Sequence, residues 1–323
     1  MYKILITGGA GFIGSNIVAQ LLELNEVVQV RVIDNLSTGY KKNIQEFLEH
    51  PKFEFQWGDI REYNSCLKAC DGMDLVCHQA ALGSVPRSIK DPLTSNAVNI
   101  TGTLNVFTAA KNAGIKRIVY AASSSTYGDS QTLPKVENEI GNPLSPYAVT
   151  KLVNELYAQV YADLYEMEFI GLRYFNVFGP KQDPNGAYAA VIPLFMKALL
   201  ENQPPVINGD GLQSRDFTYI DNAVQANVKA LFTQKPEAVN QVYNVAVGDR
   251  VNLSDLYNTL ATIAETTLKP TFGPPRPGDV RHSQANISKA QSLLGYQPEI
   301  KVEEGLRLAF EWYEKQYKKI VAQ

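Results

Sequence analysis

Short apolar runs recur along the first half of the chain, and a helix-length segment separates most of them from the next. The runs cover residues 3–6, 30–33, 53–57, 75–77, 118–120 and 169–172. Strands that are apolar nearly throughout and alternate with helices are typical of a parallel sheet that helices cover on both faces. The pattern therefore predicts an α/β fold built on a doubly wound parallel sheet.

Three intervening segments have helical patterns, at 12–24, 94–113 and 146–164. Each has apolar residues at the spacing of one helix face, and Pro146 suits the first turn of a helix. These segments are expected to pack against the sheet.

After Phe178 this rhythm breaks, and glycine and proline mark turns at 179–180, 183–186, 204–205 and 273–278. Segments near 217–232 and 242–247 still have the patterns of a helix and a strand, so we expect the chain to return to the first sheet. The predicted domains are 1–175 with a return near 217–247, and a smaller C-terminal α/β domain formed by 176–216 and 248–323.

Composition narrows the class of protein. The chain has 323 residues, of which 45% are hydrophobic, so it can bury a sizeable core. Thirty basic and thirty-three acidic residues give a net charge of −3 without long runs of one sign, which argues against nucleic acid as a partner. The N-terminus has no signal-peptide pattern and no apolar run reaches about 18 residues, so we expect a cytoplasmic protein without a membrane segment.

The cysteines favour neither a disulfide framework nor a metal site. Cys66, Cys70 and Cys77 are an odd number clustered within a dozen residues. His50, His78 and His282 supply no companion at a familiar zinc spacing, so we expect no metal.

A glycine-rich turn follows the first apolar run and precedes the first helix. Gly8, Gly11 and Gly14 give the spacing GxxGxxG, and Asp34 ends the second run twenty residues later. Such a turn lets backbone N–H groups approach a pyrophosphate, while the acid can accept both hydroxyls of an adenosine ribose and would repel a 2′-phosphate. The order strand, glycines, helix, strand and acid predicts a Rossmann-type site for NAD in preference to NADP.

Two later loops should reach the same site. Asp59 and Ile60 follow the third run, and Gln79, Ala80 and Ala81 follow the fourth. Because ligands bind at the carboxyl ends of parallel strands, we expect the first loop near the adenine and the second near the phosphates and ribose.

The chemistry is predicted from Tyr147 and Lys151, which are four apart on one helix. An ammonium beside the phenol would favour the phenolate and lower the pKa of Tyr147, making it a general base and then a general acid. Ser123 ends the fifth apolar run, where its hydroxyl could share the substrate oxygen with Tyr147.

A series of short motifs spans nearly the whole chain: TGGAGFIGS, DNLSTG, GDI, HQAA, SSSTYGD, SPYAVTK, RYFNVFGP, SRDFTYIDN and RPGDVRHS. Together they resemble the extended short-chain dehydrogenase/reductase family and, within it, the nucleotide-sugar 4-epimerases. ALGSVPRS, DPNGAYAAVIP and GDVRHSQA look most like the epimerases that interconvert UDP-N-acetylglucosamine and UDP-N-acetylgalactosamine.

The resemblance implies a mechanism and further site residues. Tyr147 would take the proton of the sugar 4-hydroxyl while hydride passes to tightly bound NAD, and the 4-ketose would turn over before hydride returns. Lys151 would also hold the nicotinamide ribose. Further cofactor residues implied by the resemblance are Phe12, Ile13, Asn35, Ser37, Thr38, Gly39, Asn99 and Tyr174. The family also implies a homodimer through the helices near 94–113 and 146–166.

A UDP-sugar carries two phosphate charges, which bidentate arginines meet best. Arg215 and Arg276 match the family positions for the diphosphate, and Asp279 matches the position for the uridine ribose. The other substrate-binding positions carried over are Ser124, Asn176, Ala190, Val191 and Asn208.

Two positions bear on the choice of sugar. Gly83 stands where galactose-type epimerases carry a lysine, and Ser84 follows with a hydroxyl that an amide could use. Ser283 stands where a tyrosine can close the pocket against an N-acetyl group. By the resemblance, these small residues admit an N-acetylated sugar.

Other functions stay open at this point. A UDP-glucose/UDP-galactose 4-epimerase has the same catalytic residues. A 4,6-dehydratase needs an acid beside Ser123, yet residues 123–128 contain none, and a dehydrogenase that forms a sugar acid normally wants a thiol, yet no cysteine follows Cys77. A non-catalytic sensor of NAD or sugar nucleotides is the alternative outside enzymes.

Overall fold

The apolar runs form the central sheet of the computed structural model, which describes residues 1–186, 188–275 and 280–321. The strands of this sheet are β1 (Tyr2–Thr7), β2 (Val27–Asp34), β3 (Phe53–Trp57), β4 (Leu75–His78), β5 (Arg117–Ser123), β6 (Glu168–Tyr174) and β11 (Gln241–Val245). Their order is β11-β6-β5-β4-β1-β2-β3, and every neighbouring pair is parallel. The predicted doubly wound sheet and the return of the chain to it are confirmed.

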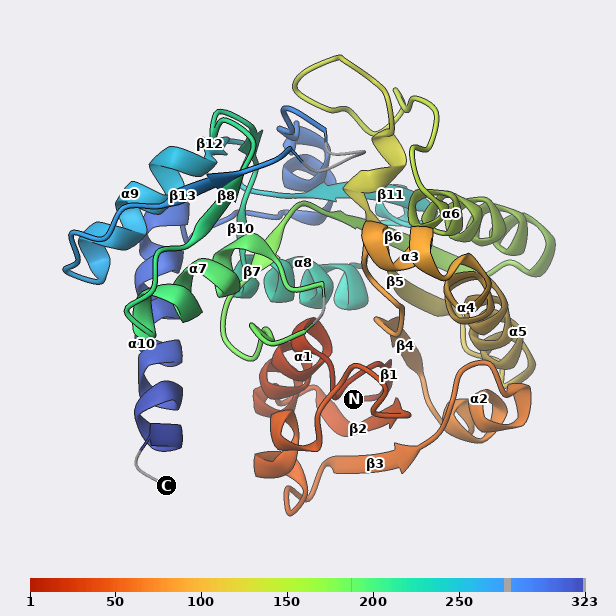
Figure 1. Ribbon diagram of the computed structural model, residues 1–323. Helices are drawn as coiled ribbons and strands as arrows, with labels where there is room; N and C mark the ends of the chain where they lie inside the picture. The colour runs from red at the N-terminus through yellow and green to blue at the C-terminus, as the bar shows by residue number, and fades with distance from the viewer. Residues whose placement is uncertain (187, 276–279, 322–323) are drawn as a thin grey trace.

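Helices cover both faces of the sheet, as Figure 1 shows: α2, α4, α5 and α6 lie on one side, and α1 and α8 on the other. The helices are α1 (Phe12–Glu23), α2 (Tyr63–Cys70), α3 (Val85–Lys90), α4 (Pro92–Asn96), α5 (Thr103–Asn112), α6 (Pro146–Tyr165), α7 (Val191–Leu200), α8 (Ile220–Phe232), α9 (Leu253–Ile263) and α10 (Val302–Val321).

The sheet separates two layers of core, which explains why its strands are apolar at nearly every position. Ile4 and Ile6 pack with Ile17 of α1, whereas Leu5 packs with Phe107 of α5 on the opposite face. Because successive side chains of a strand point to opposite faces and both faces are covered, neither face can be polar.

The helix expected over 94–113 differs from the prediction in its pitch. It begins as α4, widens into a π-helical segment over Ala97–Gly102 and continues as α5. Single π-helical turns inside helices are frequent at functional sites. Here the wide turn carries Asn99, whose side chain contacts the loop after β4.

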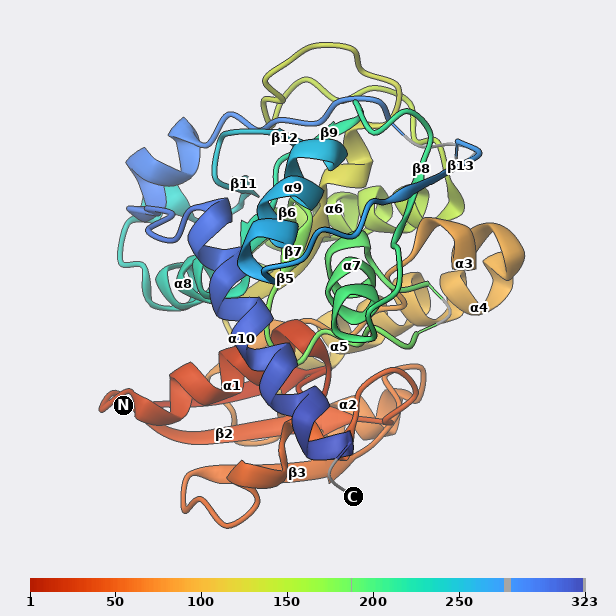
Figure 2. The same ribbon diagram turned by 60° about the vertical axis from the view of Figure 1, so that its left-hand side comes forward.

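The rest of the chain forms a smaller unit beside the carboxyl ends of the strands. It contains α7, α9, α10 and three two-stranded pairings. The pairs are β7 (Val177–Phe178) with β10 (Thr218–Tyr219), β8 (Val206–Asn208) with β13 (Thr271–Gly273), and β9 (Ser214–Arg215) with β12 (Val251–Asn252). In Figure 2, α10 begins beside α9 and runs down in front of α1 and the ends of β2 and β3.

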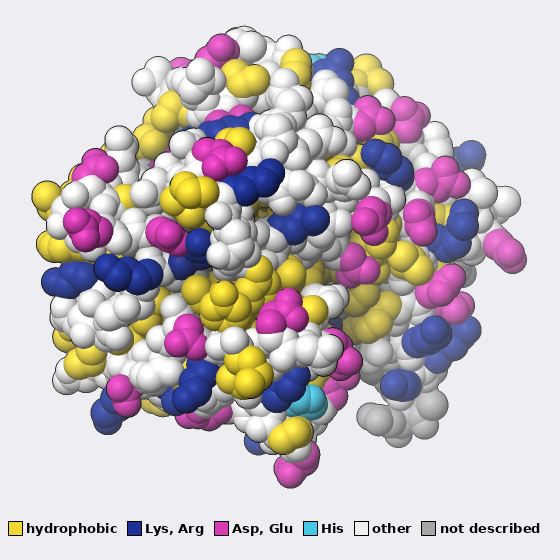
Figure 3. Space-filling view, turned by 180° about the vertical axis from the view of Figure 1, so that it is seen from behind, with side chains coloured by type: hydrophobic (Ala, Val, Ile, Leu, Met, Phe, Trp, Pro, Cys, Tyr) yellow, Lys and Arg dark blue, Asp and Glu magenta, His cyan; other side chains and the backbone are white. Residues whose placement is uncertain are grey.

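Charges of both signs are mixed on the face shown in Figure 3, where Lys and Arg side chains are interspersed with Asp and Glu side chains. The described residues of that face form no broad basic area of the kind that a phosphate backbone requires. Among the described helices, none combines the length and the apolar character needed to cross a bilayer.

Candidate active site

The glycine turn lies between β1 and α1 and is packed too tightly for side chains. Gly8 has φ +71°, and a Cβ there would lie 2.7 Å from the backbone of Ala80. A Cβ on Gly14 would lie 2.2 Å from the carbonyl oxygen of Gly8. Gly11 precedes α1, and no side chain caps the first N–H groups of that helix. The turn therefore presents uncapped backbone donors, which suits a pyrophosphate.

Asp34 ends β2 beside this turn. One of its carboxylate oxygens accepts from Ala10 N at 3.0 Å and the other from Leu36 N at 2.8 Å. Burial raises the pKa of Asp34, and these two hydrogen bonds oppose the rise. Nearby, Arg61 and Asn35 hydrogen-bond Asp59, and Arg61 is the main reason that the pKa of Asp59 falls to about 2.

A cavity of about 550 Å³ joins the predicted cofactor residues to the predicted catalytic ones. The predicted residues that line it are Gly8, Gly11, Phe12, Ile13, Asp34, Asn35, Ser37, Thr38, Gly39, Asp59, Ile60, Gln79, Ala80, Ala81, Gly83, Ser123, Ser124, Tyr147, Lys151, Tyr174 and Asn176.

This lining fits NAD. The charged side chains among the described lining residues are Asp34, Asp59 and Lys151. A 2′-phosphate on the ribose beside Asp34 would meet that carboxylate, whereas free ribose hydroxyls can donate to it.

Asn99 was expected to bind the cofactor, but the structure places it behind the cavity wall. It is fully buried, accepts from Leu82 N at 2.8 Å and donates to Leu82 O at 3.2 Å. The amide group thus fixes the loop after β4 from behind, because its own position in the π-helical turn lies inside the core.

Tyr147 and Lys151 lie near the start of α6, which Ser145 caps through Ala148 N. Lys151 is buried and Tyr147 is half-buried, and both line the cavity close to Ser123 at the end of β5. The ammonium of Lys151 lies 6.0 Å from the centre of the Tyr147 ring and donates to Ala121 O at 2.8 Å.

The predicted fall in the pKa of Tyr147 is wrong in this structure. Burial raises the pKa of Tyr147, and a hydrogen bond with Ser123 opposes the rise. Burial also lowers the pKa of Lys151 to about 8. Sequence spacing placed an ammonium near the phenol but could not show that both groups lose their hydration, which disfavours the charged form of each.

Behind the cavity, sequence reasoning missed a hydrogen-bonded cluster around Tyr174. Its hydroxyl accepts from Asn227 Nδ2 at 2.7 Å and lies 3.1 Å from the side-chain oxygen of Gln79. Asn227 is fully buried in α8 and also accepts from Gln79 Nε2 at 3.1 Å. Nothing in the sequence marked Asn227 beyond its being a polar residue in the segment near 217–232, which was expected to be a helix.

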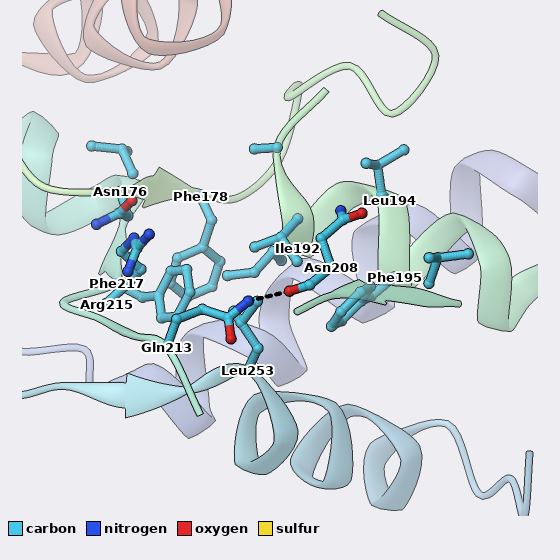
Figure 4. A pocket seen from close by; sticks show the side chains of 14 residues that line it. Asn176, Phe178, Ile192, Leu194, Phe195, Asn208, Gln213, Arg215, Phe217 and Leu253 are labelled. Carbon is cyan, nitrogen blue, oxygen red and sulfur yellow. Dashed lines mark hydrogen bonds between the residues drawn. The ribbon is translucent and has the colours of Figure 1, made fainter. Parts of the chain in front are cut away.

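A second cavity of about 250 Å³ adjoins the first, because Asn176 and Val177 line both. The predicted substrate residues in its lining are Asn176, Ala190, Val191, Asn208 and Arg215. In Figure 4, Asn176, Arg215 and Phe217 lie at one end of the cavity and Leu194 and Phe195 at the other. The amide of Gln213 donates to the backbone of Asn208 between them.

Two predicted substrate residues that the structure describes, Ser84 and Ser283, line neither cavity. Ser84 caps α3 by accepting from Arg87 N at 3.2 Å, so its hydroxyl is already engaged. Ser283 donates its backbone N–H to Ser214 O at 3.1 Å, beside Arg215. Arg276 and Asp279 lie outside the described residues.

Several lining residues were not predicted, including Val177, Gln182, Gln213 and Phe217. Gln182 follows the Gly179-Pro180 turn, and in the sequence this turn indicates only the start of irregular structure.

Comparisons with known proteins agree with this site. The model of the NAD dependent epimerase/dehydratase family matches residues 4–246. The UDP-glucose 4-epimerase of Mycolicibacterium smegmatis is 36% identical over 313 residues, which are 96% of this chain and 98% of that protein.

The chain is also similar to solved structures of nucleotide-sugar 4-epimerases. A UDP-N-acetylglucosamine 4-epimerase from Methanobrevibacter ruminantium, in complex with UDP-N-acetylmuramic acid, is 39% identical with a TM-score of 0.90, over 98% of this chain and 99% of that one. A UDP-glucuronic acid 4-epimerase from Bacillus cereus, in complex with UDP-glucuronic acid and NAD, is 33% identical with a TM-score of 0.91, over 98% of this chain and 100% of that one. This chain belongs to the NAD-dependent epimerase/dehydratase family.

Proposed function

We propose that the protein interconverts UDP-N-acetylglucosamine and UDP-N-acetylgalactosamine by NAD-dependent epimerisation at C4. The observation that carries the choice of sugar is the space beside the catalytic phenol. A Cβ on Gly83 would lie 4.0 Å from the hydroxyl of Tyr147, so any longer side chain there would extend over the sugar. With glycine in this place, no side chain fills the space beside the phenol, which supports a pocket that accepts an acetamido group.

In this proposed reaction each residue of the site has its own role. Bound NAD supplies the acceptor and donor of the hydride at C4. Tyr147 takes the proton of the 4-hydroxyl and returns it, and Ser123 hydrogen-bonds the reacting oxygen. Lys151, fixed by its bond to Ala121 O, lies close enough to favour the phenolate when it carries its proton.

The second cavity is proposed to hold the nucleotide. Arg215 offers a guanidinium to the diphosphate, and Asn176 lies where the two cavities adjoin. The smaller unit formed by 176–216 and 248–323 would then be the UDP-sugar domain. Because the diphosphate carries two charges, a planar arginine fork is the side chain best suited to it.

UDP-glucose is the second candidate substrate, and the name of the M. smegmatis relative favours it. A pocket that admits an acetamido group also admits a hydroxyl. The two candidate functions therefore differ in the relative rates at which UDP-N-acetylglucosamine and UDP-glucose are converted. The decisive experiment incubates the protein with UDP-N-acetylglucosamine, and separately with UDP-glucose, without added NAD. Proton NMR should show UDP-N-acetylgalactosamine forming faster; preferential formation of UDP-galactose would overturn the proposed sugar.

The proposed role of Ser283 in the choice of sugar can be tested by substitution. Ser283→Tyr should suppress turnover of the N-acetylated substrates by at least tenfold, a change of about 1.4 kcal/mol in transition-state stabilisation, while sparing UDP-glucose. Ser283→Ala is the matched control and should keep both activities, because alanine is as small as serine. An equal fall of both activities in Ser283→Tyr would show that residue 283 does not select the sugar.

We further propose that the protein is a homodimer through α4, α5 and α6. This proposal is supported by a row of apolar side chains on α6 that are exposed to solvent in the single chain. Leu156 is 55% exposed, Val160 48% and Leu164 66%. These residues are four apart, so they share one helix face. Leu93, on the adjacent α4, is 82% exposed.

A further inference from the structure

A short turn of helix, Ser124–Tyr127, follows β5, and Ser123 caps it. Two groups of Ser125 donate to the side-chain oxygen of Ser123. The backbone N–H of Ser125 donates to it at 3.1 Å, and the hydroxyl of Ser125 donates to it at 2.9 Å. The Oγ atom of Ser123 therefore accepts two hydrogen bonds from one residue.

Further hydrogen bonds fix this turn in place. Thr126 Oγ1 donates to the carbonyl oxygen of Ser123 at 2.8 Å. At the end of the turn, the hydroxyl of the buried Tyr127 donates to Asn244 Oδ1 of β11 at 2.6 Å. The turn is thus bound to two strands of the central sheet, and the two donors of Ser125 have defined positions beside Ser123.

These contacts determine what the hydroxyl of Ser123 can still do. A serine hydroxyl has one proton to donate and two lone pairs that accept. Ser125 engages both acceptor positions of Ser123, so the hydroxyl proton is the part that remains for a partner in the cavity.

The contact between Ser123 and Tyr147 has the same direction. Both residues line the cofactor cavity, and the hydrogen bond between their side chains lowers the pKa of the phenol. A hydrogen bond that lowers the pKa of a phenol stabilises the phenolate, which can only accept. Ser123 is therefore the donor toward the reacting groups.

We propose that Ser125 is a positioning residue that keeps Ser123 a hydrogen-bond donor to the oxygen on C4 of the sugar. This inference rests on the proposed epimerisation. Ser125 lines neither cavity, so it acts through Ser123 and not on the ligand. A hydroxyl that accepts hydrogen bonds is polarised by them and donates more strongly.

The proposal also defines the path of the proton. With both lone pairs engaged, Ser123 has no place for the proton of the sugar 4-hydroxyl and cannot relay it. The O–H bond of the sugar breaks and the same proton forms the O–H bond of Tyr147, so the phenolate accepts it directly. The transfer of hydride is unchanged.

A double-mutant cycle tests the proposal through turnover. Proton NMR gives kcat and KM for the wild type, Ser125→Ala, Ser123→Ala and the double variant, with the UDP-sugar that the wild type converts faster. We expect Ser125→Ala to lower kcat about three- to tenfold, the range of one neutral hydrogen bond, and to leave KM unchanged. In the Ser123→Ala background the same substitution should lower kcat no further, because its partner is gone. Equal losses in both backgrounds would show that Ser125 acts independently of Ser123 and would overturn the proposal.

Thr126→Val is the matched control, because it removes a hydroxyl of the same turn that bonds the backbone of Ser123 and not its side chain. Any loss of kcat that it causes should be the same in the wild-type and the Ser123→Ala backgrounds. If the effect of Thr126→Val also disappeared in Ser123→Ala, the coupling would belong to the whole turn, and the specific role of the Ser125 hydroxyl would be wrong.

A titration separates this inference from the proposed function, because it needs no sugar. In NAD-bound protein labelled with ¹³C at tyrosine Cζ, the resonance that is absent from Tyr147→Phe belongs to Tyr147, and its chemical shift follows the ionisation of the phenol. Ser125→Ala should raise the pKa of Tyr147 by about 0.5 and should not change it in the Ser123→Ala background. An unchanged pKa would overturn the role of Ser125 even where the wild type epimerises the sugar. A wild type that converts neither UDP-sugar, while Ser125→Ala shifts the pKa, would instead overturn the proposed function.

Discussion

The phenol of Tyr147 is already half-buried in the chain without ligand, and this bears on how its reactivity should depend on pH. Burial raises the pKa of Tyr147 and the hydrogen bond with Ser123 lowers it. Removing the hydroxyl in Ser123→Ala should therefore raise the pKa of Tyr147 further. The alkaline-rising limb of the kcat/KM profile should move to higher pH in this variant, since the phenolate is the active base.

The comparison needs a variant without the titrating group. Tyr147→Phe should fold, bind NAD and lose nearly all turnover at every pH. If Ser123→Ala lowered activity equally at all pH values, Ser123 would act on the substrate without tuning Tyr147. Substantial turnover in Tyr147→Phe would remove Tyr147 from the role of base.

The buried ammonium of Lys151 should cost stability. Its pKa is about 8 in the folded chain against an ordinary value of 10.5, so the unfolded chain binds more protons between these two pH values. The cost is therefore complete below about pH 8 and disappears as the pH rises to 10.5. Cofactor-free Lys151→Met should be more stable than the wild type at pH 7 by about 1–3 kcal/mol, allowing for its lost bond to Ala121 O.

Denaturant unfolding over a range of pH checks this. The difference between the variant and the wild type should be constant below pH 7 and shrink above pH 8. A difference that does not change with pH would mean that the ammonium of Lys151 is better hydrated than its burial indicates.

At the scale of elements, Asp216 connects three segments of the chain: its own, the segment that follows β11 and the segment at Ala285. Its buried carboxylate accepts from Val247 N at 3.0 Å, Gly248 N at 3.1 Å and Ala285 N at 3.2 Å. Asp216→Ala leaves these N–H groups without a partner and should cost about 2–4 kcal/mol of stability. Because Ala285 lies next to the segment of Ser283, the KM for the UDP-sugar should rise while the affinity for NAD stays unchanged.

The matched control is Asp249→Ala, since Asp249 is an exposed carboxylate in the same unit. It should change stability by less than about 0.5 kcal/mol. If Asp216→Ala weakened NAD binding as much as it raised the KM, the two cavities would be coupled through this residue.

The elements that the sequence predicted best are those in which a single requirement decides the residue type. Strands buried on both faces must be apolar, and the turn at Gly8 excludes side chains by contact with Ala80. Gln182 and Asn227 were missed because glutamine after a turn and asparagine on a helix are ordinary in sequence. Their roles come from contacts with residues more than a hundred positions away or from burial, which spacing alone does not reveal.

At the scale of the whole molecule, the proposed dimer explains an otherwise unfavourable surface. A monomer would leave the apolar row of α6 in water, and contiguous apolar patches usually mark interfaces. Leu156 and Leu164 lie two turns apart on that row, so charges at both positions should prevent a second copy from packing there. The active-site residues lie in cavities formed within one chain, so a monomeric variant should still bind NAD.

Sedimentation velocity at micromolar concentration tests this with Leu156→Arg/Leu164→Arg. We expect the wild type to sediment as a dimer and the variant as a monomer, because the desolvation of each buried guanidinium would oppose association. Leu212→Arg is the control, since Leu212 is 56% exposed but lies in the smaller unit, and it should remain dimeric. A wild type that sediments as a monomer would contradict the dimer itself. A double variant that stays dimeric would place the interface on another face, because two like charges on each copy of α6 cannot meet across a twofold axis without repulsion.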